Sequence, residues 1–592
     1  MTRATRNTSI SAAALAATAA AIVATLALAL AAQAAPKPAA APAAAAPRID
    51  DAAVPFEEEI FGWIEEITAK GIRRAGHPAN LWVEDYLVDH FRRLGLQEIT
   101  KQPVQVTAWH EGETGLTVSV GGRSHDFNAY PVAYVRKPLR AEAPLVKYRE
   151  GLEPAAMAGK IVVFDYLLAD ESALSLMASA LAVNDPKGDL HQTKHAIGIL
   201  GGRGRVGRSA AVVNRILEAG PAGVVVVMKN YHDSPYIFGS PVVRFTGPTS
   251  GSDIPTALVA PSVGARLDAL IARGDAQGTL VASARTEEVT THNVSGILPG
   301  ASPEIIQIVS HTDGNFSGAF QDAAGMSLVL AQAKYWSQIP REKRPFTLLF
   351  LLTSAHIQGS VGEQVILAEG AMHTESGTVT NRKAGAAVAR DKGRLARTML
   401  DIHLESPARE YAIGADGRLV DVGRGEPMRV FTSMAPALSG AVSAAVKAED
   451  VDRSIVLPAD VLGGHPRSAA GHFHGAGIPV VSFIGVPVYY FDGADGTDKV
   501  HRENLVPMTR ATIRIIESMR GQTKASLLEG SDDIPRGGYE ATSDAFKRGE
   551  NTSARAQAHV QFVLSFDRNG NREIDPDEEP ALLEAVRKRL AR

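Results

Sequence analysis

Residues 309–325, VSHTDGNFSGAFQDAAG, decide how the rest of the chain is interpreted. They continue a run, IIQIV, that is typical of a buried strand, and they precede LVLAQAKYW, whose apolar spacing predicts a helix. His311 and Asp313 therefore lie at the end of a predicted parallel strand, before a glycine-containing loop. Open α/β sheets bind their ligands at this edge. We therefore expect a functional site here.

Length and composition narrow the class of protein. A chain of 592 residues is too long for one hydrophobic core, so we expect several domains. Apolar residues make up 45% of the chain and charged residues 21%, which is typical of globular proteins. The net charge of −4 predicts no nucleic-acid partner. The absence of cysteine excludes disulfides, thiolate zinc sites and a cysteine nucleophile.

The first residues have the pattern of an export signal. Arg3 and Arg6 precede an Ala/Leu/Val run over 11–32 and a small-residue AQA site, so we predict a signal peptide over 1–35. An uncleaved membrane helix is the alternative, although an alanine-rich run is moderately apolar. An Ala/Pro linker follows over 36–54. Without a second long apolar run, the mature protein is predicted to be secreted or periplasmic, with no integral membrane segment.

Pattern changes divide the remaining chain. Residues 55–129 show two amphipathic helices and then period-two strands. Glycine- and proline-rich loops around short buried runs make 130–290 look like an inserted β-rich module. Strands alternate with helices over 291–522, which predicts an α/β fold with a mostly parallel sheet and helices on both faces. A polar linker, 523–551, separates this domain from a small helical tail, 552–592.

Several predicted strand ends in the third segment carry side chains that bind divalent cations. Period two places Asp401, His403 and Glu405 on one face of a strand, so we expect that not all three are buried. A single histidine more often hydrogen-bonds a loop, but four such strand ends favour a shared site. A bound cation there would lower the pKa of its water to near neutrality. The candidate residues are His311, Asp313, His356, Asp401, His403, Glu405, His472 and His474.

Longer stretches around these residues carry a family resemblance. They are GIRRAGHPANLWVEDYLVDHFRRLGLQEITKQPVQV from residue 71, THNVSGILPGASPEIIQIVSHTDG from residue 291 and AAGHFHGAGIPVVSFIG from residue 469. These stretches resemble the secreted co-catalytic zinc aminopeptidases and glutamate carboxypeptidases. The inserted runs MAGKIVVFD and ILEAGPAGVVVV resemble a protease-associated domain. The resemblance implies a zinc exopeptidase that cleaves a peptide or small amide substrate; an oligomer is possible.

The resemblance also implies a metal-ligand set, but with departures. The first zinc ligand falls on His311, and Asp313 would orient its imidazole from the second shell. The bridging carboxylate falls on Gln321, which cannot bridge two cations, and a one-residue slip would offer Asp322. The adjacent glutamate pair, general base and ligand, falls on Ala355 and His356.

The remaining ligand positions follow the same pattern. The next ligand aspartate matches Asp401, with His403 nearby in the second shell. The final Asp-His pair falls on Ala469 and Ala470, where His472 or His474 would have to substitute. The predicted metal ligands, for one or two zinc ions, are therefore His311, Asp322, His356, Asp401 and His472. No general base is assigned.

These departures leave more than one function open. The chain could be a rewired hydrolase, with the single-metal form as one variant, or a catalytically inactive relative that acts as a binding protein. A slip in the alignment is a third interpretation. Serine hydrolysis is less well supported, because Ser317 lacks the G-x-S-x-G spacing.

The tail contains a second motif, DRNGNREIDPDE, over 567–578. Its oxygen donors match positions 1, 3, 5, 7, 9 and 12 of a calcium loop between two predicted helices. The motif resembles a single EF-hand, except that Arg572 replaces the usual glycine at the sixth position. An acidic linker is the alternative. The predicted calcium ligands are Asp567, Asn569, Asn571, Glu573, Asp575 and Glu578.

Overall fold

This computed structural model describes residues 49–132, 138–197, 212–237, 254–369, 393–534, 553–571 and 574–591. The predicted signal peptide, most of the Ala/Pro linker and Glu573 lie outside the described residues. Within the described part of the chain, no helix is both long and apolar enough to span a membrane.

Two amphipathic helices open the described chain, as the sequence predicts. They are α2 (Glu57–Thr68) and α3 (Pro78–Arg93). In α2 the buried residues Ile60, Ile64 and Ile67 recur at helical spacing and face the core. A proline in the first turn of α3 fits its start, where no intrahelical N–H bond is lost.

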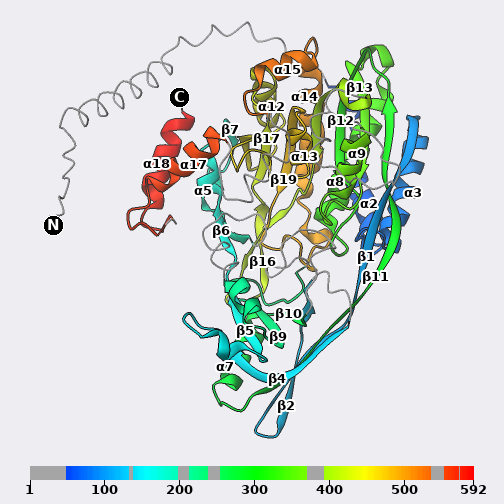
Figure 1. Cartoon of the computed structure of the whole chain (residues 1–592). Helices are drawn as coiled ribbons and strands as arrows, with labels where there is room; N and C mark the ends of the chain where they lie inside the picture. Colours follow the sequence, from blue (N-terminus) through cyan, green and yellow to red (C-terminus); the bar gives the residue numbers. More distant parts are fainter. Residues whose placement is uncertain are drawn as a thin grey trace, which may run out of the picture. The chain divides into compact units, whose positions relative to one another are not determined.

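A large sheet forms the centre of the α/β domain (Figure 1). Neighbouring strands β13, β12, β14 and β19 run parallel, while β11, β17 and β7 each make antiparallel pairs. The predicted α/β class with a mostly parallel central region is confirmed. In order across the sheet the strands are β11 (Gln277–Leu298), β13 (Phe346–Thr353), β12 (Ser302–His311), β14 (Thr398–Leu404), β19 (Val480–Gly485), β17 (Met428–Thr432), β18 (Ser454–Pro458) and β7 (Ala182–Asn184).

Alternate residues of the central strands are buried against two different helix layers. In β12, Ile306 and Ile308 join the large core, whereas Ile305 and Val309 join a second cluster. Helices α2, α3, α8 (Ala324–Gln338), α12 (Pro436–Ala448) and α14 (Leu505–Ser518) contribute to the first core. The second cluster includes α9 (Val361–Glu369), α11 (Gly393–Arg397) and α13 (Ala470–Gly475). Burial on both faces explains the continuous apolar runs.

Strands β1 (Gln97–Val120) and β11 extend as a long antiparallel pair toward a second group of strands (Figure 1). This group has its own hydrophobic clusters, with Leu267 of α7 (Pro261–Ile271) in one and Phe164 in the other. Its strands are β2 (Arg123–Phe127), β3 (Tyr130–Pro131), β4 (Leu139–Lys147), β5 (Ile161–Tyr166), β9 (Gly223–Met228) and β10 (Thr256–Val259).

Part of the predicted 523–551 linker is helical. Helix α15 (Lys524–Gly530) begins at a capping box formed by Thr523 and Ser526. This helix start was not predicted from the sequence because the surrounding residues are polar, as in a linker. The tail helices are α17 (Ala554–Leu564) and α18 (Glu579–Leu590), and Leu582 of α18 packs in the main core. The remaining short elements are η1 (Asp51–Ala53), α4 (Pro154–Met157), β6 (Ala169–Ser172), α5 (Ala173–Met177), η2 (Leu190–Gln192), β8 (Lys194–Ile197), η5 (Arg341–Lys343), β15 (Arg409–Ile413), β16 (Leu419–Gly425), η6 (Thr497–Lys499) and η7 (Arg502–Asn504).

Candidate metal centre

His311 is the last residue of β12 and is buried at the carboxyl edge of the sheet. Its Nδ1 lies 2.8 Å from the carbonyl oxygen of Asp313. Because a carbonyl can only accept, Nδ1 carries the hydrogen, and Nε2 is left to face Asp322 Oδ2 at 3.3 Å. The Asp313 carboxylate accepts the backbone N–H groups of His356 and Ile357 at 3.0 and 2.9 Å. Asp313 therefore both orients His311 and fixes the loop after β13.

Asp322 lies in a short π-helical turn, η4 (Ala319–Ala323), before α8. Its carboxylate accepts the Ser310 hydroxyl at 2.9 Å and the Ser406 backbone N–H at 3.2 Å. Gly325 makes room for this arrangement, since a Cβ there would lie 2.6 Å from Asp322 Oδ1 and 2.4 Å from Ser310 Oγ. The turn thus directs the Asp322 carboxylate, and not the Gln321 amide, toward His311.

Glu405 follows the end of β14 and completes the group. One of its carboxylate oxygens accepts the backbone N–H of Ala469 at 3.2 Å. One ligand atom from each of His311, Asp322 and Glu405 lies within 4.8 Å of the others, and all three residues are buried. We call these three residues the metal centre. Imidazole and carboxylate donors from three segments fit a zinc ion.

The electrostatics of the metal centre favour a bound cation. Burial raises the pKa of Asp322, because the charged form loses its hydration. Burial opposes protonation of His311, but the carboxylates of Asp322 and Asp313 outweigh it and raise the His311 pKa. Protons thus balance the buried negative charge when no cation is bound. A divalent cation would supply the same compensation.

The structure places the predicted ligand Asp401 against His403 rather than in the metal centre. Asp401 was predicted as a metal ligand, yet its carboxylate lies behind His403, 2.7 Å from His403 Nδ1 and 2.5 Å from the Gln307 side-chain amide. Asp401 is therefore outside the metal centre, and Glu405, four residues later, lies there instead. The shift arises because the strand continues beyond Asp401, so the sheet edge falls at Glu405.

The expectation that Asp401, His403 and Glu405 cannot all be buried is wrong. All three are buried. The His403 ring lies 5.7 Å from the Phe473 ring of α13, which covers this face of the strand. The acids and the histidine are tolerated there because they bond to one another and to neighbouring polar groups.

His356 lies beside the metal centre, with its ring centroid 4.6 Å from that of His311. Its Nδ1 is 2.9 Å from Oε1 of Glu363, a fully buried residue of α9. Burial alone would raise the pKa of Glu363, but His356 and His472 lower it to about 2. Sequence reasoning missed Glu363, because it lies inside a helix and belongs to no motif.

The two histidines of α13 have different surroundings. His472, predicted as a ligand, is close enough to Glu363 for its charge to lower the pKa of that carboxyl. His474 is fully buried, with Nε2 3.0 Å from a carboxylate oxygen of Asp533. Asp533 belongs to the predicted linker, so His474 anchors that segment.

Two buried ionisable residues, Arg73 and Asp495, hold the loop that presents Asp322. The Arg73 guanidinium donates to the Gly318 carbonyl at 2.8 Å, and Asp495 accepts the backbone N–H groups of Phe320 and Gln321 at 2.9 and 3.1 Å. Burial raises the pKa of Asp495 to about 8. The Ser317 hydroxyl donates to the Asp495 carbonyl at 3.1 Å, so Ser317 helps to hold this loop in place.

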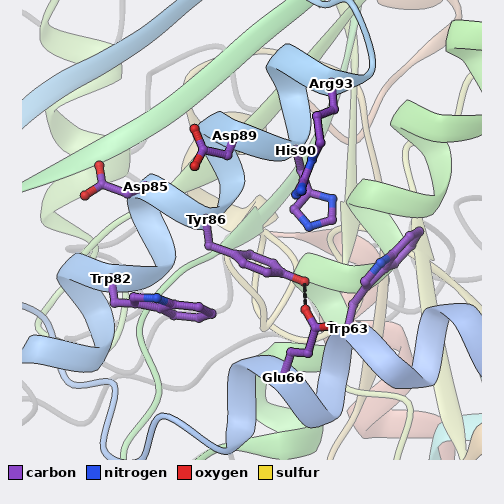
Figure 2. Close-up of a pocket in the computed structure, with 8 residues that line it drawn as sticks. All are labelled: Trp63, Glu66, Trp82, Asp85, Tyr86, Asp89, His90 and Arg93. Atoms are coloured by element: carbon purple, nitrogen blue, oxygen red, sulfur yellow. Dashed lines mark hydrogen bonds between the residues drawn. The ribbon is translucent and has the colours of Figure 1, made fainter.

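A separate pocket of about 380 Å³ lies between α2 and α3 (Figure 2). Trp82, Tyr86 and Trp63 line it, and the Tyr86 hydroxyl donates to Glu66 at 2.7 Å. Two of its carboxylates already have cationic partners: Asp85 pairs with Lys101 and Asp89 with Arg92. None of its lining residues belongs to the metal centre.

The tail loop is described except for 572–573. Gly570 N donates to Asp567 Oδ1 at 2.7 Å, and the side-chain amides of Asn569 and Asn571 donate to Asp575 at 2.7 and 2.9 Å. Glu578 is buried and accepts the backbone N–H of Asp575 at 3.0 Å. The five described residues of the predicted calcium set thus make hydrogen bonds within the loop.

Comparisons with known proteins identify the fold. No protein-family model and no curated protein matches the sequence. A solved structure of a peptidase M28 precursor from Shewanella amazonensis SB2B is 17% identical, covers 79% of this chain and 93% of that chain, and gives a TM-score of 0.56. BSAP, a zinc aminopeptidase from Bacillus subtilis, is 16% identical, with 81% and 100% coverage and a TM-score of 0.52. The described chain therefore has the fold of these peptidases.

Proposed function

We propose that this chain is a metal-dependent hydrolase of the exopeptidase type, which cleaves peptide or other small amide bonds outside the cytoplasm. The observation that supports the proposal most is the convergence of His311, Asp322 and Glu405, with one ligand atom from each within 4.8 Å of the others. The fold shared with M28 peptidases adds support. These three residues would hold one zinc ion.

A zinc ion there would lower the pKa of a bound water and polarise a substrate carbonyl. Residues around the metal centre hold its ligand side chains in place. Asp313 fixes the His311 tautomer through its carbonyl, and Ser310 and the Ser406 N–H fix the Asp322 carboxylate. The His356 side chain is 21% exposed and lies against His311, so it is placed to meet a substrate.

The second candidate function is a catalytically inactive binding protein on the same fold. Two observations favour it: Gln321 precedes Asp322 where a bridging carboxylate is expected, and Ala355 offers no carboxylate where a base is expected. Ala355 is also fully buried, with a positive φ of 56°. A measurement of substrate turnover distinguishes the hydrolase from the inactive binding protein.

The test uses the mature chain, purified and loaded with zinc. Metal is counted by mass spectrometry, and hydrolysis is followed with aminoacyl anilides and short peptides. We expect bound zinc and turnover, and His311→Ala should lose both. His77→Gln, a change at another buried histidine that bonds the Trp109 carbonyl at 2.9 Å, should keep both. Zinc without turnover on any substrate would favour the binding protein, and no bound zinc would contradict the metal-dependent hydrolase.

Two further modules belong to the proposal. We propose that 130–290 forms a protease-associated domain that helps to select substrates, and that 552–592 forms an EF-hand that binds calcium. The calcium proposal is supported by hydrogen bonds within the loop: the Asn569 side chain donates to Asp575, and the Asp567 carboxylate accepts the Gly570 N–H. The predicted signal peptide supports localisation outside the cytoplasm.

A further inference from the structure

The pocket between α2 and α3 contains two charged side chains whose charges are not matched by a partner (Figure 2). The carboxylates of Asp85 and Asp89 have cationic partners. Within the described chain no ion pair involves Glu66 or Arg93, and Glu66 accepts the Tyr86 hydroxyl at 2.7 Å. Both of these residues are exposed. One negative and one positive charge are therefore open to a ligand.

The aromatic side chains of the pocket are held by their contacts with one another. Along α3, the Trp82 ring centroid lies 4.9 Å from that of Tyr86, which lies 4.4 Å from that of His90. The Trp63 ring of α2 meets His90 in an edge arrangement at 5.9 Å. Burial lowers the pKa of His90 to about 4, so this ring is neutral at pH 7. The pocket thus has an uncharged aromatic wall that needs no ligand to form.

The two open charges lie at opposite ends of this wall. Glu66 is level with Tyr86, whose hydroxyl it accepts, whereas Arg93 is the last residue of α3. Figure 2 shows His90 between them. The positions of Tyr86 and Arg93 are separated by about 10 Å along the helix axis, at about 1.5 Å per residue. The volume of about 380 Å³ is large enough for a small ligand of that length.

We propose that this pocket binds a short peptide with free ends, two or three residues long, whose amino terminus lies at Glu66 and whose carboxyl terminus lies at Arg93. An extended peptide advances by about 3.5 Å per residue, so two or three residues span roughly 7–10 Å. Both terminal contacts are charge-assisted hydrogen bonds, and a guanidinium can hold a carboxylate through two of them. Apolar side chains of the peptide would pack on Trp63 and Tyr86.

Charge matching favours a peptide over the other small molecules that bind aromatic walls. A simple organic cation would leave Arg93 unmatched, and a neutral sugar would leave both open charges unmatched. A peptide with free ends matches both at once. Since exposed charges each contribute modestly, we expect binding to need both termini as well as the aromatic wall. The inference does not rest on the metal centre, because no residue of the pocket belongs to it.

Tryptophan fluorescence tests the proposal, because two of the four tryptophans, Trp63 and Trp82, line the pocket and the other two are fully buried. The mature chain is stripped of metal, which prevents metal-dependent hydrolysis of the probe, and is titrated with the tripeptide leucyl-glycyl-leucine. We expect a saturable change in emission, with one site per chain by calorimetry. Acetylating the amino terminus or amidating the carboxyl terminus of the probe should each weaken binding roughly five- to tenfold.

Variants assign each terminus of the probe to its partner. In Glu66→Gln, which can still accept the Tyr86 hydroxyl, the free and acetylated peptides should bind alike. In Arg93→Gln the free and amidated peptides should bind alike. Glu65→Gln is the matched control, a change at the neighbouring exposed glutamate of α2 that does not line the pocket. It should keep the wild-type preference for free ends.

Several results would overturn the inference. The wild type would bind blocked and free peptides equally, or Glu66→Gln would still distinguish them, or cellobiose or tetramethylammonium would bind in place of the peptide. The blocked probes require no variant, so they decide the matter even if a variant unfolds. Zinc counting on the metal-loaded chain tests the proposed function separately, and its outcome leaves the peptide result unchanged.

Discussion

Among the described residues, the metal centre and the tail loop each bring together side chains predicted to bind a cation, and they are built in opposite ways. His311, Asp322 and Glu405 come from three segments and are all buried. The tail donors lie within 567–578, and two of them, Asn569 and Asn571, are exposed. The geometry of a site within one loop follows from the spacing of its residues along the sequence. The geometry of a site at a sheet edge depends instead on how distant segments pack. The two sites should therefore respond independently to mutation.

The largest expected effect is at the metal centre. Asp322→Asn keeps the shape of the side chain but removes a negative ligand, so zinc affinity and any turnover should fall by more than about 100-fold. Zinc titration and an anilide assay measure this change. The calcium response of the tail should remain as in the wild type. If Asp322→Asn also abolished the calcium response, the two sites would not be independent.

The tail loop provides the reciprocal test. Saturating calcium, at about 100 times the Kd, should stabilise the intact protein by about 2.7 kcal/mol if only the folded loop binds it. Asp567→Ala combined with Glu578→Ala should abolish the rise in Tm. The control is Asp577→Ala, a change at an exposed acid of the same loop that is not among the predicted ligands. An equal rise in Tm in the double variant would show that the loop is not the calcium site.

Packing around the metal centre can be tested without changing a ligand. Gly325→Ala would place a Cβ 2.4 Å from Ser310 Oγ and 2.5 Å from the Leu404 carbonyl, so we expect destabilisation of about 1–3 kcal/mol. Zinc affinity should fall as well, because Asp322 would have to move. Denaturant unfolding and zinc titration measure the two effects. Gly440→Ala, with open space around its Cβ, is the control.

A pH dependence of stability should originate at Asp495. Its pKa rises from 3.8 to about 8 in the folded protein because the carboxyl is buried. Its contribution to stability is therefore complete below about pH 4 and is lost as the pH rises to about 8, at up to about 1.4 kcal/mol per pH unit. Asp495→Asn should flatten this part of the stability curve, as measured by urea unfolding between pH 5 and pH 8. Parallel curves for the two proteins would contradict the assignment.

The contrast between local spacing and long-range packing also explains which features could be predicted from the sequence. Helical spacing located α2, and the apolar run before His311 located β12, because local periodicity follows directly from burial. The ligand on this strand was predicted at Asp401, by resemblance, whereas Glu405 lies in the metal centre; both residues are on the same face, and periodicity cannot say where the sheet edge falls. Glu363 was missed because its contact with His356 depends on the packing of α9.

The sequence by itself determined the α/β class, the strand that ends at His311 and the contiguous tail motif. All three depend on spacing along the chain, which sequence records directly. The tertiary structure decided that Asp322 rather than Gln321 faces His311, and that Glu405 rather than Asp401 joins them. Those choices depend on backbone turns and on contacts between distant segments, which no local pattern specifies.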